Sequence, residues 1–406
     1  MRVLWFVPGG VDPQANALTP ALIDLMTRLS RRIELVVVPF EESRPADLRI
    51  HAGVPIVAAG SGRYPPFLRL VEALQIADEL HGRRRFGVVH GLCGIRAAAL
   101  AAFWGQRRGV PSIISFFGGE PVSFPDIGYG GWSRRPSRIL LRFALRRARM
   151  KTAASAFLVE KFKAVGLMGP WRRLGFGIDR SRFGSSRRSS APRPPYTLLK
   201  LADFGAIKDH ATAIATLAHL NRTHPARLIL AGTTQRRREI EACIQRHGLE
   251  DRVEIRGRVP PEAVPRLLDQ ADALIHTSRH EGQGMVLLEA AAAGCPLVST
   301  PVGIALEMAD AGAACLADVG DPVGLSRSLL AILHDPIRRR DQIRRAKDFV
   351  KAYDGEIVAQ RVTAFYRELC SRGGCSSGAL YVAEHAMGGG AQGGVGAGAH
   401  GERSIP

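Results

Sequence analysis

The sequence has no long hydrophobic run. A helix that spans a membrane needs about 20 consecutive apolar residues, whereas the longest apolar run in this chain is Ala97–Trp104. The apolar start, Met1–Val7, is too short for the core of a secretory signal peptide and leads directly into Pro8. We therefore expect a cytoplasmic protein whose first residues form a buried strand.

Cysteine and aromatic residues are also scarce. The six cysteines are scattered and none belongs to a C-x-x-C pair, so neither a zinc site nor a disulfide framework is predicted. Aromatic residues make up 6% of the chain, and it carries no recognised nucleic-acid-binding motif. A nucleic-acid-binding protein is therefore the weaker alternative, and we do not expect nucleic acid as a partner.

Acidic residues are scarce in the first half of the chain. Residues 1–190 hold 30 Lys and Arg against 13 Asp and Glu, whereas residues 191–406 hold 26 against 24. This asymmetry indicates that the first half faces an anionic partner, such as a phospholipid surface or a phosphorylated carrier. A coding bias towards arginine is the alternative explanation of the net charge of +19, but it does not explain the asymmetry.

Short apolar runs alternate with amphipathic stretches along most of the 406 residues, a length typical of two to three domains. The runs show little polar alternation, as strands buried on both faces of a parallel sheet should. The expected strands are Val3–Val7, Ile33–Val38, Val54–Ala58, Phe86–His90, Ser112–Phe116, Tyr196–Leu201, Arg227–Ala231, Val253–Ile255, Ala273–His276 and Pro296–Ser299. Expected helices include Ala17–Leu29, Pro66–Leu80, Ile95–Arg107, Asp209–Asn221, Arg237–His247, Pro261–Gln270, Met285–Ala293 and Pro322–Leu333. Such alternation predicts βαβ units in two doubly wound sheets.

The composition divides the chain into two α/β halves and a tail. Residues 1–185 and 196–345 are the expected domains, and residues 186–195, within a stretch rich in Ser, Arg and Pro, are the expected linker. Arg339–Cys370 has helical periodicity, and residues 346–370 are the expected C-terminal helix. Residues 371–406 contain a glycine-rich run and too few apolar residues to offset the entropy of ordering, so we expect a disordered tail.

The segment around residues 276–296 carries the most chemical information. A strand is expected to end near His276, a loop with Gly282 and Gly284 follows, and a helix starts near Met285. The first N–H groups of a helix have no intrahelical partner, so this helix start is suited to a diphosphate.

Two glutamates flank this predicted anion site. Glu281 lies in the loop and Glu289 lies one turn inside the helix. Two carboxylates would repel a diphosphate unless they bind the neutral hydroxyl groups at its two ends. A nucleotide sugar has that arrangement, with a sugar at one end of the diphosphate and a ribose at the other.

This segment resembles the donor site of the family 4 (group 1) retaining glycosyltransferases of the GT-B fold. The resemblance rests on the E-x7-E spacing of Glu281 and Glu289 in a loop and helix that end at Gly294-x-Pro296, and it extends over roughly residues 1–370. It implies a GT-B fold, in which two doubly wound parallel-sheet domains face a central cleft, and transfer of a sugar from a nucleotide sugar.

The resemblance assigns roles to individual residues of the donor site. It implies that Glu281 contacts the donor sugar, that Glu289 binds the ribose and that Lys208 neutralises the leaving phosphate, whose charge grows as the glycosidic bond breaks. It also matches the amides of Gly284, Met285 and Val286 to the diphosphate, and Gly232 and Val259 to the nucleoside. Glu307 matches the acid after the last glycine-rich turn of the family. Two further matches lie at domain ends: Leu174–Asp179 with Phe183 resembles the end of the first domain, and Phe365–Cys370 resembles a helix that packs back on that domain.

Two positions depart from the family pattern. Asp203 stands where the family usually has a second phosphate-binding arginine, so we expect its carboxylate to turn away or to pair with Lys208 or Arg279. Phe117 stands where many members have histidine, and Glu120 close by is either a ligand of a substrate hydroxyl or a surface acid.

Weaker candidates lie on the acceptor side of the predicted cleft. The Gly9-Gly10 turn after the first strand resembles a glycine-rich loop near the reaction centre and is equally compatible with a plain tight turn. Gly118 belongs to the loop of Glu120. His90 ends a predicted strand, where a core or rim histidine is favoured over one that faces the cleft. The chain has no D-x-D sequence, so we expect neither a metal nor another cofactor.

The segment Ser133–Arg149 has the pattern of an interfacial helix. Arg138, Arg142, Arg146 and Arg149 recur at helical spacing, beside an apolar surface formed by Ile139, Leu140, Phe143 and Leu145. Such a helix can lie at the surface of an anionic membrane, and its alternative is a solvated face of a packed helix. We therefore expect the protein to be peripheral on the inner face of a membrane.

Together these patterns predict a retaining glycosyltransferase that moves a sugar from a nucleotide diphosphate to an acceptor hydroxyl, in the synthesis of a polysaccharide or glycolipid. Its expected partners are a nucleotide sugar, a glycan or lipid-linked acceptor, and a membrane surface reached through residues 133–149. The alternative within the same fold is a binding protein of weak catalytic power, suggested by Asp203 and Phe117.

Overall fold

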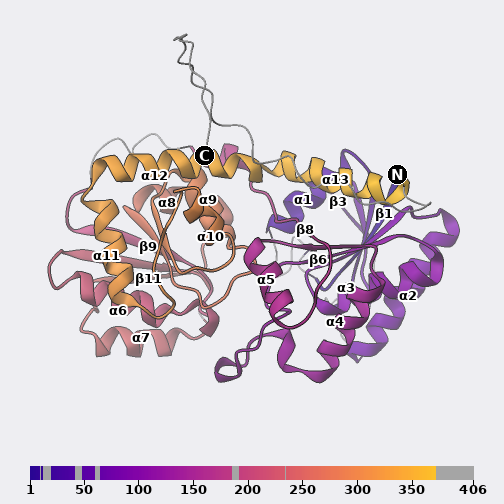
Figure 1. Ribbon diagram of the computed structural model, residues 1–406, viewed down its shortest axis with the longest axis horizontal. Helices are drawn as coiled ribbons and strands as arrows, with labels where there is room; N and C mark the ends of the chain where they lie inside the picture. The colour runs from indigo at the N-terminus through magenta and orange to yellow at the C-terminus, as the bar shows by residue number, and fades with distance from the viewer. Residues whose placement is uncertain are drawn as a thin grey trace, which may run out of the picture. The chain divides into compact units, whose positions relative to one another are not determined.

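Residues 1–9, 11, 20–41, 48–59, 65–184, 192–233 and 235–371 are described by a computed structural model, shown in Figure 1. Met1–Ser371 forms one unit. Most of the predicted linker and residues 372–406 of the predicted tail lie outside the described residues, as does Gly10. Within the described part of the chain, no helix is both long and apolar enough to cross a membrane.

The first sheet has the strand order β3-β4-β2-β1-β5-β6-β7-β8. Its strands are β1 (Arg2–Val7), β2 (Glu34–Pro39), β3 (Leu48–His51), β4 (Val54–Val57), β5 (Val88–Leu92), β6 (Ser112–Phe116), β7 (Met150–Ala153) and β8 (Trp171–Arg173). The α-helices of this half are α1 (Pro20–Ser30), α2 (Pro66–Arg83), α3 (Ile95–Arg108), α4 (Arg135–Arg147) and α5 (Ala156–Ala164). Both faces of the sheet are buried: Leu4 and Phe6 of β1 pack in one hydrophobic core, and Val3 and Trp5 pack in the other.

The second sheet has the strand order β11-β10-β9-β12-β13-β14, and all its pairs are parallel. Its strands are β9 (Tyr196–Leu201), β10 (Ala226–Ala231), β11 (Val253–Gly257), β12 (Ala273–His276), β13 (Leu297–Ser299) and β14 (Cys315–Leu316). The helices of this half are η4 (Ala206–Lys208), α6 (His210–Leu220), α7 (Arg237–Arg246), η5 (Pro261–Ala263), α8 (Val264–Gln270), α9 (Met285–Ala293), α10 (Ala305–Asp310), α11 (Pro322–Leu333) and α12 (Pro336–Phe349). Because the strands are parallel, their carboxyl ends meet at one edge, where the loops that carry Lys208 and Glu281 begin.

The final helix, α13 (Gly355–Ser371), returns to the first half of the chain (Figure 1). The Tyr366 hydroxyl accepts a hydrogen bond of 2.7 Å from Trp5 Nε1 of β1, and Arg172 of β8 pairs with Glu368. These contacts agree with the helix that the family resemblance implies over Phe365–Cys370.

The structure adds strands that the apolar pattern did not predict. β3 runs antiparallel to β4 around a turn in which both Ala52 and Gly53 have positive φ, so the expectation of an entirely parallel first sheet is wrong at this edge. β7 and β8 are short and contain Lys151, Arg172 and Arg173, so no continuous apolar run marks them.

Helix α4 lies within the segment Ser133–Arg149, where a helix was predicted. Ile139 is 66% exposed and Leu140 is also exposed, whereas Leu145 is buried. Phe143 is partly buried against the core. The prediction that Leu145 belongs to the apolar surface is therefore wrong, because that side of α4 packs onto the protein.

Candidate active site

The segment between β12 and α9 has the predicted strand–loop–helix form, with boundaries at His276 and Met285. Gly282 lies so close to the first half of the chain that a Cβ there would collide with the carbonyl oxygen of Phe117. Gly284 has a φ of +90° and directly precedes the helix. The two glycines therefore let the loop turn sharply and approach the loop that follows β6.

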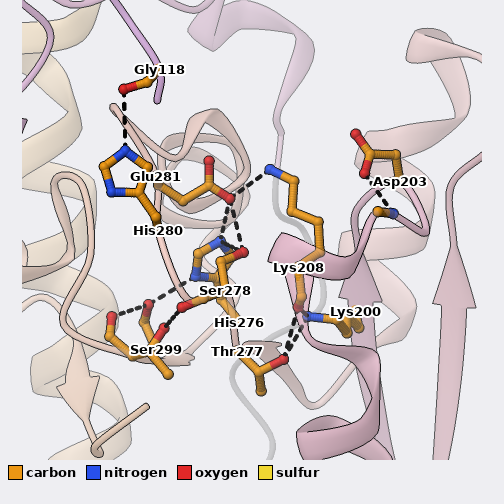
Figure 2. Close-up of polar contacts among 12 residues, drawn as sticks. Gly118, Lys200, Asp203, Lys208, His276, Thr277, Ser278, His280, Glu281 and Ser299 are labelled. Carbon is orange, nitrogen blue, oxygen red and sulfur yellow. Dashed lines mark hydrogen bonds and ion pairs between the residues drawn. The ribbon is translucent and has the colours of Figure 1, made fainter. Parts of the chain in front are cut away.

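Lys208 and Glu281 form an ion pair at the centre of the site (Figure 2). Lys208 Nζ lies 2.7 Å from Glu281 Oε1. The same carboxylate accepts a hydrogen bond of 2.9 Å from Ser278 Oγ, and His276 Nε2 lies 3.3 Å from it. The structure thus brings together two residues that are 73 positions apart in the sequence.

The pair keeps both partners charged. Burial alone would raise the pKa of Glu281, but Lys208 and His276 hold that pKa well below its usual range. Burial alone would lower the pKa of Lys208, but Glu281 raises it. His276 lies in a buried position that lowers its pKa, so its ring is neutral near pH 7. The site therefore presents one ammonium and one carboxylate side by side.

The N-terminus of α9 adjoins this pair. Among the described residues, no side chain caps the helix at Gly284. Met285 and Val286 occupy its first turn, and both are partly exposed. Uncapped N–H groups at a helix start carry a partial positive charge that favours an anion. Lys208, which pairs with Glu281, and the helix start that follows the Glu281 loop are thus two groups of positive charge.

Glu289 lies one turn inside α9 and is partly buried. Burial raises its pKa to about 7, although the charge of Arg182 acts in the opposite direction. The carboxyl of Glu289 is therefore partly protonated near neutral pH, and in either state it can accept a hydrogen bond from a hydroxyl group.

The remaining predicted donor residues have different surroundings. Gly232 directly follows β10, where a Cβ would collide with the carbonyl oxygen of Ala202. Val259 follows β11 and is partly buried against the hydrophobic core of the second domain. These positions lie after the carboxyl ends of neighbouring strands, as a nucleoside-binding edge requires.

Asp203 is exposed and turned towards its own loop. Its Oδ1 accepts a hydrogen bond of 3.0 Å from the Gly205 amide (Figure 2). Arg279 pairs with Asp126 of the first domain and lies over the ring of Phe124. The predicted alternative in which Asp203 turns away agrees with this geometry, whereas a pairing with Arg279 does not.

On the first domain, a cavity of about 740 Å³ is lined by residues of the loops after β1, β2, β5 and β6 and of helices α3 and α4, among them Pro8, Glu41, Cys93, Arg96, Glu120, Tyr129 and Arg134. Glu120 is buried in its wall, where burial raises its pKa and its Oε2 accepts a hydrogen bond of 3.0 Å from the Gly118 amide. Gly9 adjoins this region in sequence and is partly exposed. The ring of Phe117 stacks on that of Phe176, with a centroid distance of 4.1 Å.

His90 does not belong to this cavity. It is fully buried, with Nδ1 2.7 Å from the Tyr366 hydroxyl and Nε2 2.6 Å from Ser115 Oγ. Burial lowers its pKa to about 3, so the ring is neutral. His90 is therefore a hydrogen-bonded core histidine, which is the favoured of its two predicted interpretations, and its weaker assignment to the acceptor side of the cleft is wrong.

Hydrogen bonds between the two domains hold the Glu281 loop. Gln283 Nε2 donates to the carbonyl of Phe176 at 2.8 Å while its Oε1 accepts from the Phe176 amide at 2.7 Å. Ser155 Oγ donates to the Gly282 carbonyl at 2.6 Å, and the ring of His280 bonds the Gly118 carbonyl at 3.1 Å. Sequence reasoning did not assign a role to Gln283, and only its position between Gly282 and Gly284 marks it.

Glu307 also lies between the domains. Its Oε1 accepts a hydrogen bond of 2.8 Å from the Ala156 amide at the start of α5, and its Oε2 lies 2.6 Å from Arg173 Nη1. The residue thus has partners on the first domain in this structure.

Two family models match the chain, one in each domain. The model of the glycosyl transferase 4-like domain matches residues 9–176, and that of glycosyl transferases group 1 matches residues 183–349. Together the two matches extend over most of the chain.

The curated relatives match only part of this chain. The glycogen synthase of Mycobacterium tuberculosis is 31% identical over 47% of this chain and 46% of its own length. A GDP-mannose:cellobiosyl-diphosphopolyprenol alpha-mannosyltransferase of Xanthomonas oryzae pv. oryzae is 28% identical over 61% of this chain and 63% of its own length. The chain thus spans about half the length of the first of these curated relatives.

Solved structures match over nearly the whole described chain. A sucrose-phosphate synthase from Thermosynechococcus elongatus aligns with a TM-score of 0.77 and 19% identity, over 91% of this chain and 99% of its own. Anabaena HepE in complex with UDP-glucose aligns with a TM-score of 0.69 and 19% identity, over 91% and 100%. These likenesses confirm the predicted fold class. The chain belongs to the group 1 glycosyltransferases and has the GT-B fold.

Proposed function

We propose that this protein transfers a sugar, with retention of anomeric configuration, from a nucleotide diphosphate to an acceptor hydroxyl. The observation that carries this proposal is the partly buried Lys208–Glu281 pair beside the uncapped start of α9, in a member of a glycosyltransferase family. The titles of two similar proteins support a nucleotide-sugar donor, since one is bound to UDP-glucose and the other is named for GDP-mannose.

Each part of the donor then meets a suitable group. The diphosphate lies between the ammonium of Lys208 and the N–H groups of Met285 and Val286, which stabilise the charge that grows as the glycosidic bond breaks. Glu281 binds hydroxyl groups of the sugar, and Glu289 binds the ribose. When the diphosphate reaches Lys208, it competes with Glu281 for the ammonium, and this frees the carboxylate to orient the sugar.

The acceptor side of the reaction is proposed for the cavity of the first domain. Glu120 and Tyr129 line it, and the charge of Glu281 in the second domain contributes to raising the pKa of Tyr129, so the two regions adjoin. An acceptor hydroxyl there attacks the sugar while the departing phosphate takes its proton. A glycan or a lipid-linked carrier fits this proposal, in polysaccharide or glycolipid synthesis.

We propose that the reaction needs no metal ion. Lys208 and the helix dipole of α9 supply the positive charge that a divalent cation provides in other sites. Turnover should then be unchanged by excess EDTA. A loss of activity on chelation, restored by Mg²⁺ or Mn²⁺, would contradict this part of the proposal.

We also propose that the first domain binds an anionic membrane surface through α4. The exposed side chains of Ile139 and Leu140 lie beside three arginines of this helix, of which Arg142 and Arg146 are exposed and Arg138 is partly exposed. Apolar side chains beside cations suit the boundary between lipid headgroups and acyl chains. A membrane location would bring the enzyme to a lipid-linked acceptor.

Release of UDP or GDP from a panel of nucleotide sugars, with glycan and polyprenyl-diphosphate-linked acceptors, tests the function. Acceptor-dependent release and a glycosylated product of retained configuration are the expected results. The second candidate, a binding protein of weak catalytic power, is favoured by Asp203 in place of a second cation. It predicts that a nucleoside diphosphate binds but that no acceptor accelerates its release.

A further inference from the structure

Lys200 is a buried lysine in the central region of the second sheet. It lies on β9, between apolar residues, and only 1% of its surface is exposed. Lysine is almost never fully buried without a partner, because its ammonium loses its hydration. The contacts of this side chain therefore require an explanation that hydrophobic packing does not provide.

The Lys200 ammonium bonds two segments of the donor site (Figure 2). Its Nζ donates hydrogen bonds to the Lys208 carbonyl at 2.8 Å and to Thr277 Oγ1 at 2.7 Å. Thr277 Oγ1 in turn donates to the Asp209 carbonyl at 2.6 Å. One amino group thus connects the backbone that carries Lys208 with the start of the loop that carries Glu281.

We propose that Lys200 is a positioning residue of the donor site, whose buried amino group holds the Lys208 segment against the Glu281 loop and whose charge favours the diphosphate. This inference rests on the proposed function for the identity of the ligand. The positioning itself rests only on the hydrogen bonds of Lys200 and Thr277.

Charged and titratable groups surround Lys200 on several elements. Burial lowers its pKa to about 7, while Asp209, Glu281 and Asp203 act to raise that pKa and Lys208 acts to lower it. His276 and His210 also face it, and the charges of Lys200 and Lys208 add to the burial that lowers the pKa of both histidines. Both rings are therefore neutral near pH 7, where Lys200 itself titrates.

Protonation of Lys200 changes its charge more than its hydrogen bonds. A neutral amine still has two N–H groups, enough for the Lys208 carbonyl and Thr277 Oγ1. A bound diphosphate favours the protonated form, so its binding near pH 7 should take up a proton. Affinity for the diphosphate should then fall as the pH rises above 7, whereas a purely structural lysine would give no such dependence.

The test measures UDP and GDP binding to the full chain by calorimetry between pH 6 and 8.5. Lys200→Met keeps the length of the side chain and removes the amino group. We expect it to weaken binding about tenfold at pH 6, because it removes a positive charge that favours the diphosphate and the hydrogen bonds that position the Lys208 segment. We also expect it to abolish the fall above pH 7. Because Glu289 also titrates near 7, the pH series is run in the Glu289→Gln background.

Thr363→Val is the matched control. Thr363 is buried in α13, where its hydroxyl donates to the Ala359 carbonyl far from the donor site in sequence. The control removes a buried polar group and should leave nucleotide binding unchanged. Unchanged affinity in Lys200→Met at pH 6, or a fall above pH 7 that persists in that variant, would overturn the proposal.

Amide hydrogen exchange separates this proposal from the proposed function. Lys200→Met should speed exchange in residues 205–209 and 277–284, whereas Thr363→Val should not. If wild type binds no nucleoside diphosphate while this faster exchange is seen, the function is wrong and the positioning holds; unchanged exchange overturns the positioning. Should Lys200→Met not fold, Thr277→Val replaces it, and unaltered exchange and binding in that variant overturn the proposal.

Discussion

At the scale of single residues, the proposed donor site depends on two opposite charges held together in a largely buried position. Lys208 and Glu281 are both largely buried and each offsets the charge of the other. Removal of one partner of such a pair leaves an uncompensated charge, which is strongly destabilising. Substitutions at the two positions should therefore be measured for their effect on thermal stability as well as on turnover.

Lys208→Ala and Glu281→Ala should each lower transfer by roughly 10² to 10³, the effect of about 2.7–4 kcal/mol lost from a preorganised electrostatic site. Steady-state release of the nucleoside diphosphate measures this effect. Lys163→Ala, which removes the exposed partner of Glu160, is the control and should keep full activity. Turnover near that of wild type in either site variant would refute the assigned roles.

The same pair predicts a stability pattern. Lys208→Met and Glu281→Gln should each lower the melting temperature, whereas the double variant should lose less than the sum of the two. The reason is that the second substitution removes the charge that the first leaves unpaired. Additive losses in calorimetric melting would show that the two side chains do not interact.

Glu289 predicts a dependence of stability on pH. Burial raises its pKa to about 7 in the folded protein, above the ordinary value of about 4.3 in an unfolded chain. The folded state thus binds more protons between these two values, and the stability from this group is present below pH 4 and is lost as the pH rises through 7. Glu289→Gln should therefore melt near wild type at pH 5 and above it at pH 8.

The control for this pH series is Glu262→Gln, an exposed carboxylate of the same domain. Its melting temperature should follow that of wild type at every pH. If the difference between Glu289→Gln and wild type is the same at pH 5 and pH 8, the carboxyl of Glu289 does not titrate in this range.

At the scale of elements, α4 combines two surfaces. One face packs into the first domain through the buried side chains of Leu141, Ala144 and Leu145. Arg138 and Arg142 lie over the ring of Trp132. The opposite, exposed face of α4 carries both arginines and the apolar side chains of Ile139 and Leu140, as membrane docking requires.

A triple variant in which Arg138, Arg142 and Arg146 are changed to Gln should no longer co-sediment with anionic liposomes at low salt. Each arginine near an anionic surface contributes about 1 kcal/mol, so three together bind reversibly and are screened by salt. The matched control changes Arg338, Arg340 and Arg344 of α12 to Gln, with an equal loss of charge in the other domain. Docking through α4 is wrong if wild type does not sediment or if both triple variants behave alike.

At the scale of the whole molecule, the C-terminal helix closes the chain onto its beginning. Tyr366 of α13 is fully buried, and its hydroxyl contacts both Trp5 and His90. Gln283 and Ser155 then connect the Glu281 loop to the first domain. The Glu281 loop is thus held by its own domain, through the Lys208 ion pair, and by hydrogen bonds to the first domain.

Deletion of residues 372–406 should leave the melting temperature and nucleotide affinity unchanged, because this segment is rich in glycine and has no periodic apolar residues. Deletion from Tyr366 onwards is the contrasting variant. It removes a buried aromatic side chain, whose loss typically costs about 3–5 kcal/mol. A fall of several degrees on the shorter deletion would show that the tail packs on the protein.

The sequence by itself determined the fold class and the local form of the donor segment. Strands buried on both faces produce continuous apolar runs, so the central strands were predictable. The short strands β7 and β8, the last two at one end of the first sheet, contain charged residues and were not predictable in this way. The E-x7-E spacing and the glycines around it indicated the loop and helix that carry Glu281 and Glu289, because helix starts and sharp turns depend on local residues.

Only the tertiary structure decided which distant side chains meet. The pairing of Lys208 with Glu281, the burial of His90 against Tyr366 and the contact of Arg279 with Asp126 join residues far apart in the chain. Lys200 stands in an apolar strand, but nothing in the sequence indicates that its amino group bonds Thr277 and the Lys208 carbonyl. Such contacts depend on how the sheets and loops pack, and packing places side chains together irrespective of their separation in sequence.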